Sequence, residues 1–258
     1  MRWEKLSFRD FDRIDRNTPV LLNIAAIEQH GPHLPLDVDS RIGRHFCDLI
    51  DKRMADNVLV LPQIKVCCSR HHMDFAGTLT VSHETLLAYL RDIVACVKAH
   101  GFKNLLILNS HGGNQAIGRV AIEAIGPEFS ADGGRLAFTS WWDVAAEALM
   151  DISRTGPFGV GHACEFETSL MQLIAPEEVR TEALTGQTFE TFAPWADADL
   201  LRPAPVSLYR SMKDMSAGSG VVGDPSSASA ETGRVIVDIV IPALVAILTE
   251  LSAPPRDD

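Results

Sequence analysis

Residues 19–27 read Pro-Val-Leu-Leu-Asn-Ile-Ala-Ala-Ile and form a short, almost wholly apolar run. Such a run is typical of a β-strand that is covered on both faces, as in a parallel sheet. Similar runs predict further strands at residues 57–61, 103–108 and 135–140, and helical spacing of apolar residues lies between them at 40–54, 82–100 and 115–125. Strands that alternate with helices predict parallel βαβ units and therefore an α/β fold.

The chain has 258 residues, of which 46% are hydrophobic, 22% charged and 7% aromatic. This length can bury the core of one large α/β domain, and because no linker or repeat divides the sequence we predict a single domain over residues 1–258. Residues 183–228 are rich in Pro, Ser, Gly and Asp. An irregular segment of that length is uncommon unless it covers a site or makes a subunit contact.

Charge and targeting features bear on partners and location. The formal net charge of −11 argues against nucleic acid and anionic membrane surfaces as partners. The charged first residues lack the apolar core of a secretory signal, and the most apolar stretch, residues 235–251, contains Asp238 and Pro242. We expect that stretch to be a buried helix rather than a membrane span. Five scattered cysteines without CxxC spacing indicate free thiols, so a cytoplasmic location is predicted.

A first polar cluster follows the apolar run of residues 19–27. Glu28 and His30 would point to the same side of an extended chain, and the proline-containing stretch after them can return Asp39 to the same place. Carboxylate, imidazole and carboxylate are the ligands of hydrolytic Zn, Mn or Fe sites. The alternative is that these side chains only hydrogen-bond a turn. Because they interrupt a buried strand, we favour a metal site at the carboxyl edge of the sheet.

A second cluster follows the strand predicted at residues 103–108. His111 would lie at the same sheet edge, and Gly112 and Gly113 allow the backbone to turn sharply and to approach a ligand. A phosphate-binding loop is the rival interpretation, but neither of the common glycine-rich phosphate motifs is present. Metal ligation by His111 is therefore preferred.

A third cluster, Gly161-His-Ala-Cys-Glu-Phe-Glu167, opens another helix. In a helix Glu165 and Glu167 lie on roughly opposite faces, at about 100° per residue, so one can face a metal while the other caps or packs. The spacing does not decide between them. Glu165 is assigned to the metal and to catalysis, and Glu167 to a supporting or capping position. His162 is expected to shuttle a proton or contact substrate, with an ordinary loop histidine as the alternative.

Four strings resemble the creatininase (creatinine amidohydrolase) family: Glu-Gln-His-Gly-Pro-His-Leu-Pro (28–35), Phe-Ala-Gly-Thr-Leu-Thr (75–80), Asn-Ser-His-Gly-Gly-Asn (109–114) and His-Ala-Cys-Glu-Phe-Glu-Thr-Ser (162–169). They span most of the chain in family order. The resemblance implies a three-layer α/β sandwich with a mostly parallel central sheet, two divalent metal ions per chain (Zn, Mn or Fe), hydrolysis of a small amide and a homohexamer. It also implies metal ligation by Glu28, His30, Asp39 and His111, with Asp39 bridging the ions.

The chain departs from creatinine-hydrolysing members at two places. Those members carry His-Tyr-Glu with the Glu as a ligand, where this chain has Gly113, so the missing ligand is expected to be Glu165. They also carry Trp-Asp where this chain has Phe158 and Gly159, which points away from creatinine itself. The His-Gly-Gly-Asn form resembles formamidopyrimidine deformylases and the peptidase that trims the mycofactocin precursor. The residues expected to contact the substrate are His72, Gly113, Asn114 and Phe158.

The leading hypothesis is a metal-dependent amidohydrolase in which a hydroxide bridging two ions attacks the carbonyl of a small amide. A metallopeptidase that trims a short peptide, or a formamide deformylase, would apply the same chemistry to another substrate. The non-enzymatic alternative is a Rossmann-like protein that binds a small molecule, with structural His and Glu residues. The convergence of three polar clusters on strand ends favours the enzyme.

Overall fold

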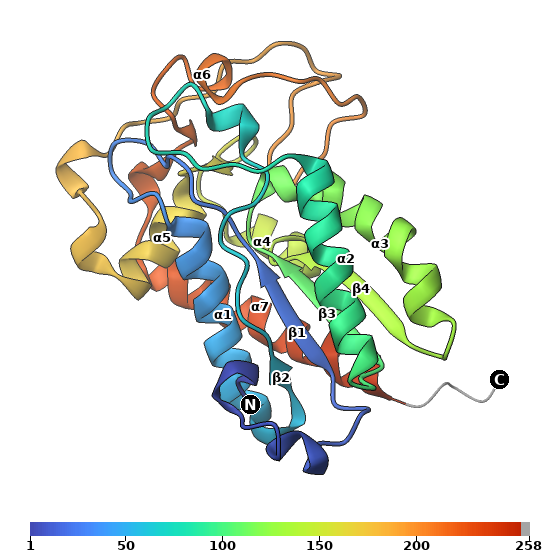
Figure 1. Ribbon diagram of the computed structural model, residues 1–258. Helices are drawn as coiled ribbons and strands as arrows, with labels where there is room; N and C mark the ends of the chain where they lie inside the picture. Colours follow the sequence, from blue (N-terminus) through green and yellow to red (C-terminus); the bar gives the residue numbers. More distant parts are fainter. Residues whose placement is uncertain (254–258) are drawn as a thin grey trace.

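The computed structural model describes residues 1–253 and has a central sheet of four parallel strands (Figure 1). Their order is β2–β1–β3–β4, and their bounds are β1 Val20–Ile24, β2 Leu59–Val60, β3 Asn104–Asn109 and β4 Arg135–Ser140. The register pairs Ile24 with Asn109 and Asn109 with Ser140. Strands β1, β3 and β4 therefore end at one edge of the sheet, as the sequence predicted.

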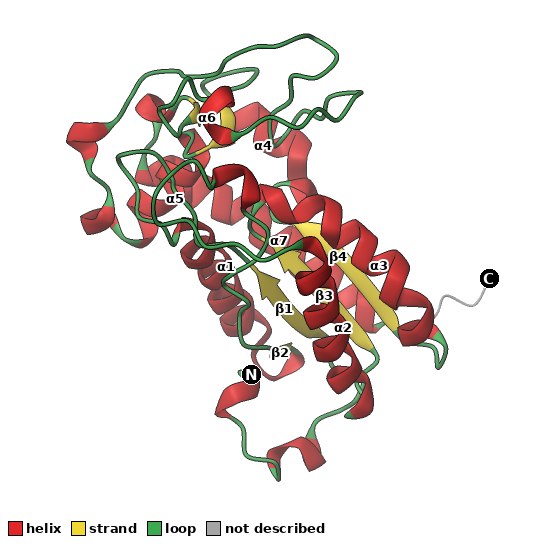
Figure 2. Ribbon diagram, turned by 45° about the horizontal axis from the view of Figure 1, so that its top comes forward, coloured by secondary structure: helices red, strands yellow, loops and turns green. Residues whose placement is uncertain are grey.

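Helices cover both faces of the sheet and complete three layers (Figure 2). On one side lie α1 (Val38–Met54), α4 (Ala146–Ile152), α5 (Glu165–Ile174) and α7 (Ala230–Ser252), and on the other α2 (His83–Ala99) and α3 (Gln115–Ser130). Successive residues of β1 and β3 alternate between the two cores, with Leu21 and Leu106 in one and Leu22 and Ile107 in the other. This alternation explains why β1 and β3 carry apolar residues on both faces. The three-layer α/β fold with a mostly parallel sheet is confirmed.

The predicted helices form close to their expected bounds. Ser82 caps α2 by accepting a hydrogen bond from the backbone N–H of Thr85 at 3.2 Å. Gly101 follows the end of α2 with a φ of +85°, a left-handed conformation that glycine adopts without a steric cost. Helix α1 begins two residues earlier than expected, at Val38, and α3 continues beyond residue 125 to Ser130.

Helix α7 contains the most apolar stretch of the chain. By length and composition alone it could cross a membrane. It packs against α1 and α5, where it buries Ile236, Val240, Leu244 and Leu248. The exposed positions of the helix carry Pro242 and Ala246 and five polar side chains: Glu231, Arg234, Asp238, Thr249 and Glu250. The helix therefore has the two-sided pattern of a core helix.

Residues 183–228 pass over the edge at which the strands end (Figure 1). They contain the short helix α6 (Met212–Met215) and the strand β6 (Val222–Gly223), which pairs antiparallel with β5 (Val160–His162). The backbone N–H of Leu200 donates to the carbonyl of Val160 at 2.9 Å. The segment is thus attached to the body of the molecule directly above the carboxyl ends of the strands.

Candidate metal centre

Seven ionisable side chains meet at the carboxyl edge of the sheet, and each of them is at most 8% exposed. Two follow β1, one lies in the first turn of α1, one is on the short 3₁₀ helix of residues 70–72, one follows β3, one ends β5 and one is in the first turn of α5. In that order they fall at Glu28, His30, Asp39, His72, His111, His162 and Glu167. Four histidines and three carboxylates are therefore brought together from distant parts of the chain.

The loop after β1 brings Asp39 opposite His30. The backbone N–H of Glu28 donates to the carbonyl of Leu36 at 2.9 Å, which closes the loop on itself. Gly31 turns the chain with a φ of +64°, where a side chain would be strained. The closed loop leads directly into α1, so Asp39 enters the site from the first turn of that helix.

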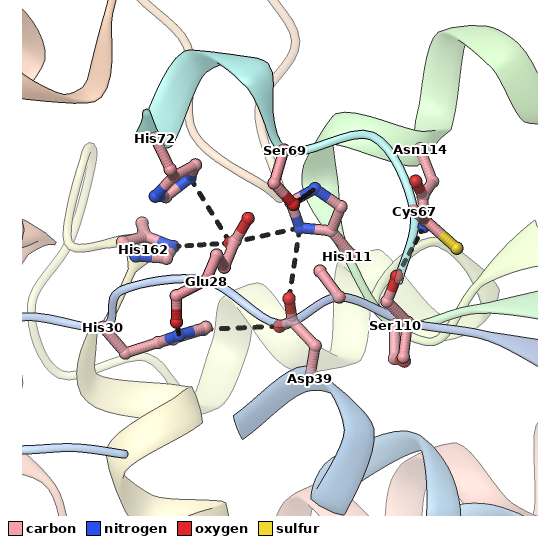
Figure 3. A network of polar contacts seen from close by, with 12 residues as sticks. Glu28, His30, Asp39, Cys67, Ser69, His72, Ser110, His111, Asn114 and His162 are labelled. Atoms are coloured by element: carbon pink, nitrogen blue, oxygen red, sulfur yellow. Dashed lines mark hydrogen bonds and ion pairs between the residues drawn. The ribbon is translucent and has the colours of Figure 1, made fainter. Parts of the chain in front are cut away.

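The carboxylate of Asp39 lies between two groups of side chains (Figure 3). Its Oδ2 is 3.1 Å from His111 Nδ1, which is also 3.2 Å from Glu28 Oε1. Its Oδ1 is 3.4 Å from His30 Nε2, which is 3.9 Å from Glu167 Oε1. One carboxylate therefore presents one oxygen to each group, as a bridging ligand would.

Three sets of side chains have ligand atoms close enough to share a metal ion, all within 4.8 Å of one another. The sets are Glu28 with Asp39 and His111, His30 with His162 and Glu167, and Glu28 with His72 and His162. Four buried atoms of the cluster lack a hydrogen-bond partner: Glu28 Oε1 and Oε2, His30 Nε2 and Asp39 Oδ2. Burying unpaired carboxylates is costly. Among residues 1–253, no Lys or Arg lines the cavity at this cluster, so a divalent cation fits the residues present.

Two of the histidines are oriented by carbonyl groups behind them. His111 Nε2 lies 2.9 Å from the carbonyl of Cys68, and His30 Nδ1 lies 3.0 Å from the carbonyl of Glu28. A carbonyl oxygen only accepts, so these nitrogens carry the proton. The opposite nitrogens face the carboxylates and are available to a metal, the usual arrangement of ligating histidines.

The electrostatics of the cluster are those of a site that requires positive charge. Burial disfavours the charged form of His30, but the carboxylates of Asp39, Glu167 and Glu28 together raise its pKa to about 9. Burial likewise acts against charged His111, yet Glu28 and Asp39 raise its pKa well above the ordinary value. Burial raises the pKa of Glu167 to about 7. Protons therefore occupy positions that a metal ion would take.

Metal binding is expected to weaken as the pH falls. In the ion-free site His30 has a pKa of about 9 and Glu167 a pKa of about 7, so both hold protons that an ion must displace. Each displaced proton lowers the apparent affinity roughly tenfold per pH unit below its pKa. From pH 8 to pH 6 the affinity for Zn²⁺ should thus fall about 100-fold or more. Competition titrations against a chromophoric chelator measure the Zn²⁺ affinity at each pH. An affinity that stays the same from pH 8 to pH 6 would contradict the assignment of His30 and Glu167 as ligands.

A cavity of about 160 Å³ opens beside the cluster. Its apolar wall comes mainly from the segment 183–228, which contributes Ala198, Leu200, Met212, Met215 and Val222. Of the two uses that the sequence allowed for this segment, it therefore covers the site. His71, His72 and Gly112 complete the polar side together with the carboxylates.

The structure places Glu165 outside the cluster, in contrast to the sequence-based assignment. Its carboxylate accepts hydrogen bonds from Ser153 Oγ, the backbone N–H of Arg154 and Thr155 Oγ1, the last at 2.8 Å. Glu167 points into the cavity instead and faces His30. The two carboxylates do lie on different faces of α5, but the helix is rotated so that the second faces the site.

Three of the four expected substrate contacts do not line the cavity, and only His72 does. Asn114 is fully buried, where it bonds the backbone of Cys68 and Ala25 and so supports the loop. Gly113 packs behind His111, since a Cβ there would lie 2.4 Å from His111 Nε2. Phe158 stacks on Phe189 with ring centroids 4.7 Å apart. These residues shape the loops around the site rather than its surface.

Sequence reasoning missed most of the cavity wall. The residues it did not assign are His71, Gly112 and Gly161 and six from the aperiodic segment: Ala198, Asp199, Leu200, Met212, Met215 and Val222. For those six, the unusual length and composition of residues 183–228 were the signal of a role.

Curated relatives resemble this chain over most of its length. A mycofactocin precursor peptide peptidase of Mycobacterium ulcerans (strain Agy99) is 32% identical over 222 residues, which cover 83% of this chain and 78% of the peptidase. A creatinine amidohydrolase of Pseudomonas putida is 24% identical over 250 residues, which cover 91% of this chain and 90% of that enzyme.

Solved creatininases share the fold over nearly the whole chain. A crystal structure of creatinine amidohydrolase (creatininase) has a TM-score of 0.82 and 23% identity, covering 98% of both chains. A mutant creatininase in a Zn–Zn form has a TM-score of 0.80 and 22% identity, covering 98% of this chain and 98% of that one. The sequence pattern of the family described as Creatininase, creatinine amidohydrolase, matches residues 4–248. The chain therefore belongs to the creatininase family.

Proposed function

We propose that this creatininase-family amidohydrolase cleaves the C–N bond of a small amide with the help of two divalent metal ions. Glu28, Asp39 and His111 would hold one ion, and His30, Asp39 and Glu167 the other. The observation that carries the proposal is the position of Asp39, with Oδ2 3.1 Å from His111 and Oδ1 3.4 Å from His30. The unpartnered buried oxygens of Glu28 and Asp39 support it.

Zinc or manganese suits this mixed set of carboxylates and imidazoles, and iron is also compatible. When bound, paired ions supply a polarised amide carbonyl and an activated water at neutral pH. The chain's own residues orient the substrate and move protons. The apolar wall of Leu200, Met212, Met215 and Val222 excludes bulk water and holds the substrate over the ligands.

His162 is the proposed proton-transfer residue. Its Nδ1 lies 3.6 Å from Glu28 Oε1, on the cavity side of the cluster. Burial, together with the neighbouring His30, lowers its pKa well below the ordinary histidine value, so the ring is neutral before the reaction. A neutral ring can take the proton that the attacking water loses and return it to the departing nitrogen.

The size of the cavity, about 160 Å³, favours a small substrate or the end of a longer one. A short peptide is the second candidate. Its support is that the mycofactocin precursor peptidase of M. ulcerans is more similar to this chain than the P. putida creatinine amidohydrolase, at 32% against 24% identity. The two candidates are separated by supplying the zinc- or manganese-loaded protein with creatinine, N-formyl amines and short peptides, and identifying the products by mass spectrometry.

Replacing His162 with alanine is expected to lower kcat by about 10²–10⁴-fold on whichever amide is turned over, the usual contribution of a proton-transfer group. The metal content should stay at the wild-type level, because none of the proposed ligands is removed. Elemental analysis and initial rates measure the two effects. His83→Ala, at an exposed position in α2, is the control and should change neither. Wild-type turnover in His162→Ala would remove His162 from the mechanism.

The cytoplasmic location and the homohexamer stay predictions. Light scattering on the eluting peak of a size-exclusion column tests the hexamer directly. A monomer with full activity would mean that the segment 183–228 completes the cavity without help from a neighbouring copy.

A further inference from the structure

Gln29 occupies a buried position between two histidines of the cluster, and the proposed chemistry gives it no role. Only 5% of the residue is exposed. Its side-chain amide nitrogen is 3.0 Å from His72 Nδ1, and its backbone carbonyl is 2.6 Å from His162 Nε2. It therefore contacts both rings on the side away from Glu28.

The amide of Gln29 can adopt only one orientation. The backbone N–H of Gly31 donates to Gln29 Oε1 at 2.9 Å, so that atom must be the oxygen and its partner the nitrogen. Gly220 leaves the room that this orientation needs, because a Cβ there would lie 2.2 Å from Oε1. The nitrogen of Gln29 is consequently directed at His72 as a donor.

This orientation fixes which nitrogen of each ring carries a proton. His72 Nδ1 faces a donor and must accept, so the proton of His72 is on Nε2, which lies 3.3 Å from Glu28 Oε1. His162 Nε2 faces a carbonyl and must donate, so the nitrogen left to face Glu28 is Nδ1. The amide nitrogen of Gln29 is also 3.1 Å from His162 Nε2, but that nitrogen already donates and cannot accept.

We propose that Gln29 is a positioning residue that holds His72 as a hydrogen-bond donor and His162 as an acceptor. The set of Glu28, His72 and His162 then binds no ion, although its atoms are close enough, because the nitrogen that His72 offers bears a proton. The Nε2–H of His72 is left to steady the carboxylate of Glu28. The link to catalysis rests on the proposed function, whereas the protonation pattern depends only on Gln29.

Long-range ¹H–¹⁵N correlation spectra of protein labelled with ¹⁵N in its histidine rings read the pattern directly. In both ion-free and zinc-loaded protein we expect protonated Nε2 and bare Nδ1 for His72, and protonated Nε2 for His162. His72→Gln and His162→Gln identify the signals by their loss. A proton on Nδ1 of His72 in the wild type would overturn the proposal, and so would three zinc ions per chain.

The substitution Gln29→Glu is expected to reverse which ring nitrogen of His72 carries the proton. A carboxylate keeps its bond to Gly31 but can only accept from His72, so the proton of His72 should move to Nδ1 and leave Nε2 bare. The zinc stoichiometry should then rise by up to one ion per chain, and kcat should fall by about 10–100-fold, as for other residues that orient ligands. Gln187→Glu is the control, because it makes the same chemical change at an exposed position.

The outcomes separate this inference from the proposed function. Unchanged His72 signals in folded Gln29→Glu would refute the role of Gln29 whatever the metal content. Wild-type protein that binds no zinc yet has the expected ring protons would refute the two-metal site and leave the role of Gln29 standing. If Gln29→Glu does not fold, the wild-type spectra still decide the inference.

Discussion

Asp39→Asn is expected to bind less than one metal ion per chain and to lose hydrolysis by far more than the roughly 10–100-fold that loss of an orienting neighbour costs. The carboxylate is 1% exposed and gives one oxygen to His111 and the other to His30. An amide keeps the shape but supplies a single weak ligand oxygen and no charge. Both halves of the proposed centre therefore lose their shared ligand at once. Elemental analysis and initial rates measure the two losses.

Asp37→Asn is the control for this substitution. Asp37 lies two residues earlier, at the N-cap of α1, but it is 38% exposed and pairs with Arg41 at 2.8 Å. A surface pair of this kind contributes about 0–1 kcal/mol, so metal content and rate should match the wild type. If Asp39→Asn instead kept two ions, Asp39 would not be the bridging ligand.

Glu167→Gln is expected to lose metal and activity, whereas Glu165→Gln is expected to lose stability and keep its metal. Glu167 faces His30 at 3.9 Å, so its loss should remove one of two ions and lower the rate at least as far as His162→Ala. Among residues 1–253, the hydrogen bonds to the Glu165 carboxylate come from Ser153, Arg154 and Thr155, outside the cluster, so its loss should leave the ions in place. The neutral amide would weaken buried, charge-assisted hydrogen bonds and lower the free energy of unfolding by about 1.5–3 kcal/mol.

Metal content and urea unfolding, measured on both variants, test this pair of expectations. Each variant serves as the control for the other, since both are glutamates in the first turn of α5 that become glutamine. Loss of metal from Glu165→Gln with retention in Glu167→Gln would restore the assignment made from the sequence. Equal destabilisation without metal loss would mean that neither glutamate binds an ion.

The strands and helices were predictable because their signal is local. Residues 19–27 are apolar except for Asn23, and residues 105–108 are wholly apolar. Helices α1, α2 and α3 carry regular apolar stripes, so neighbouring positions alone reveal the pattern. The meeting of Glu28, His30, Asp39 and His111 was also predictable, since parallel strands bring their carboxyl ends to one edge. For these features the structure adds the distances, whereas the residues involved could be named from the sequence.

The rotation of α5 could not be predicted from its own sequence. Its direction depends on packing against α7, where Gly233 comes so close that an added Cβ would be 2.4 Å from the carbonyl of Ser169. It also depends on Ser153 and Thr155, which lie before the helix in a separate loop and hold Glu165. Such long-range contacts produce no periodic pattern in the sequence of α5.

The cavity wall was unpredictable for a related reason. Met212 and Met215 reach the site because residues 183–228 fold back over the sheet, and irregular segments have no repeating pattern from which such a path could be read. The prediction that Asn114 contacts the substrate was wrong for a different reason. A polar residue beside a ligand motif can equally hydrogen-bond the backbone, and here Asn114 bonds the backbone of Ala25 and Cys68.

The closeness of Glu28 and Glu167 also has a consequence for the unfolded chain. These carboxylates both line the cavity beside the cluster, but most of the sheet and the four helices α1 to α4 separate them along the sequence. The two proposed ions, joined through their shared ligand Asp39, would link these carboxylates as a reversible cross-link that closes a very long loop. Such links stabilise a fold by the chain entropy they remove from its denatured state. The supply of free metal would then set the lifetime of the folded protein as well as its activity.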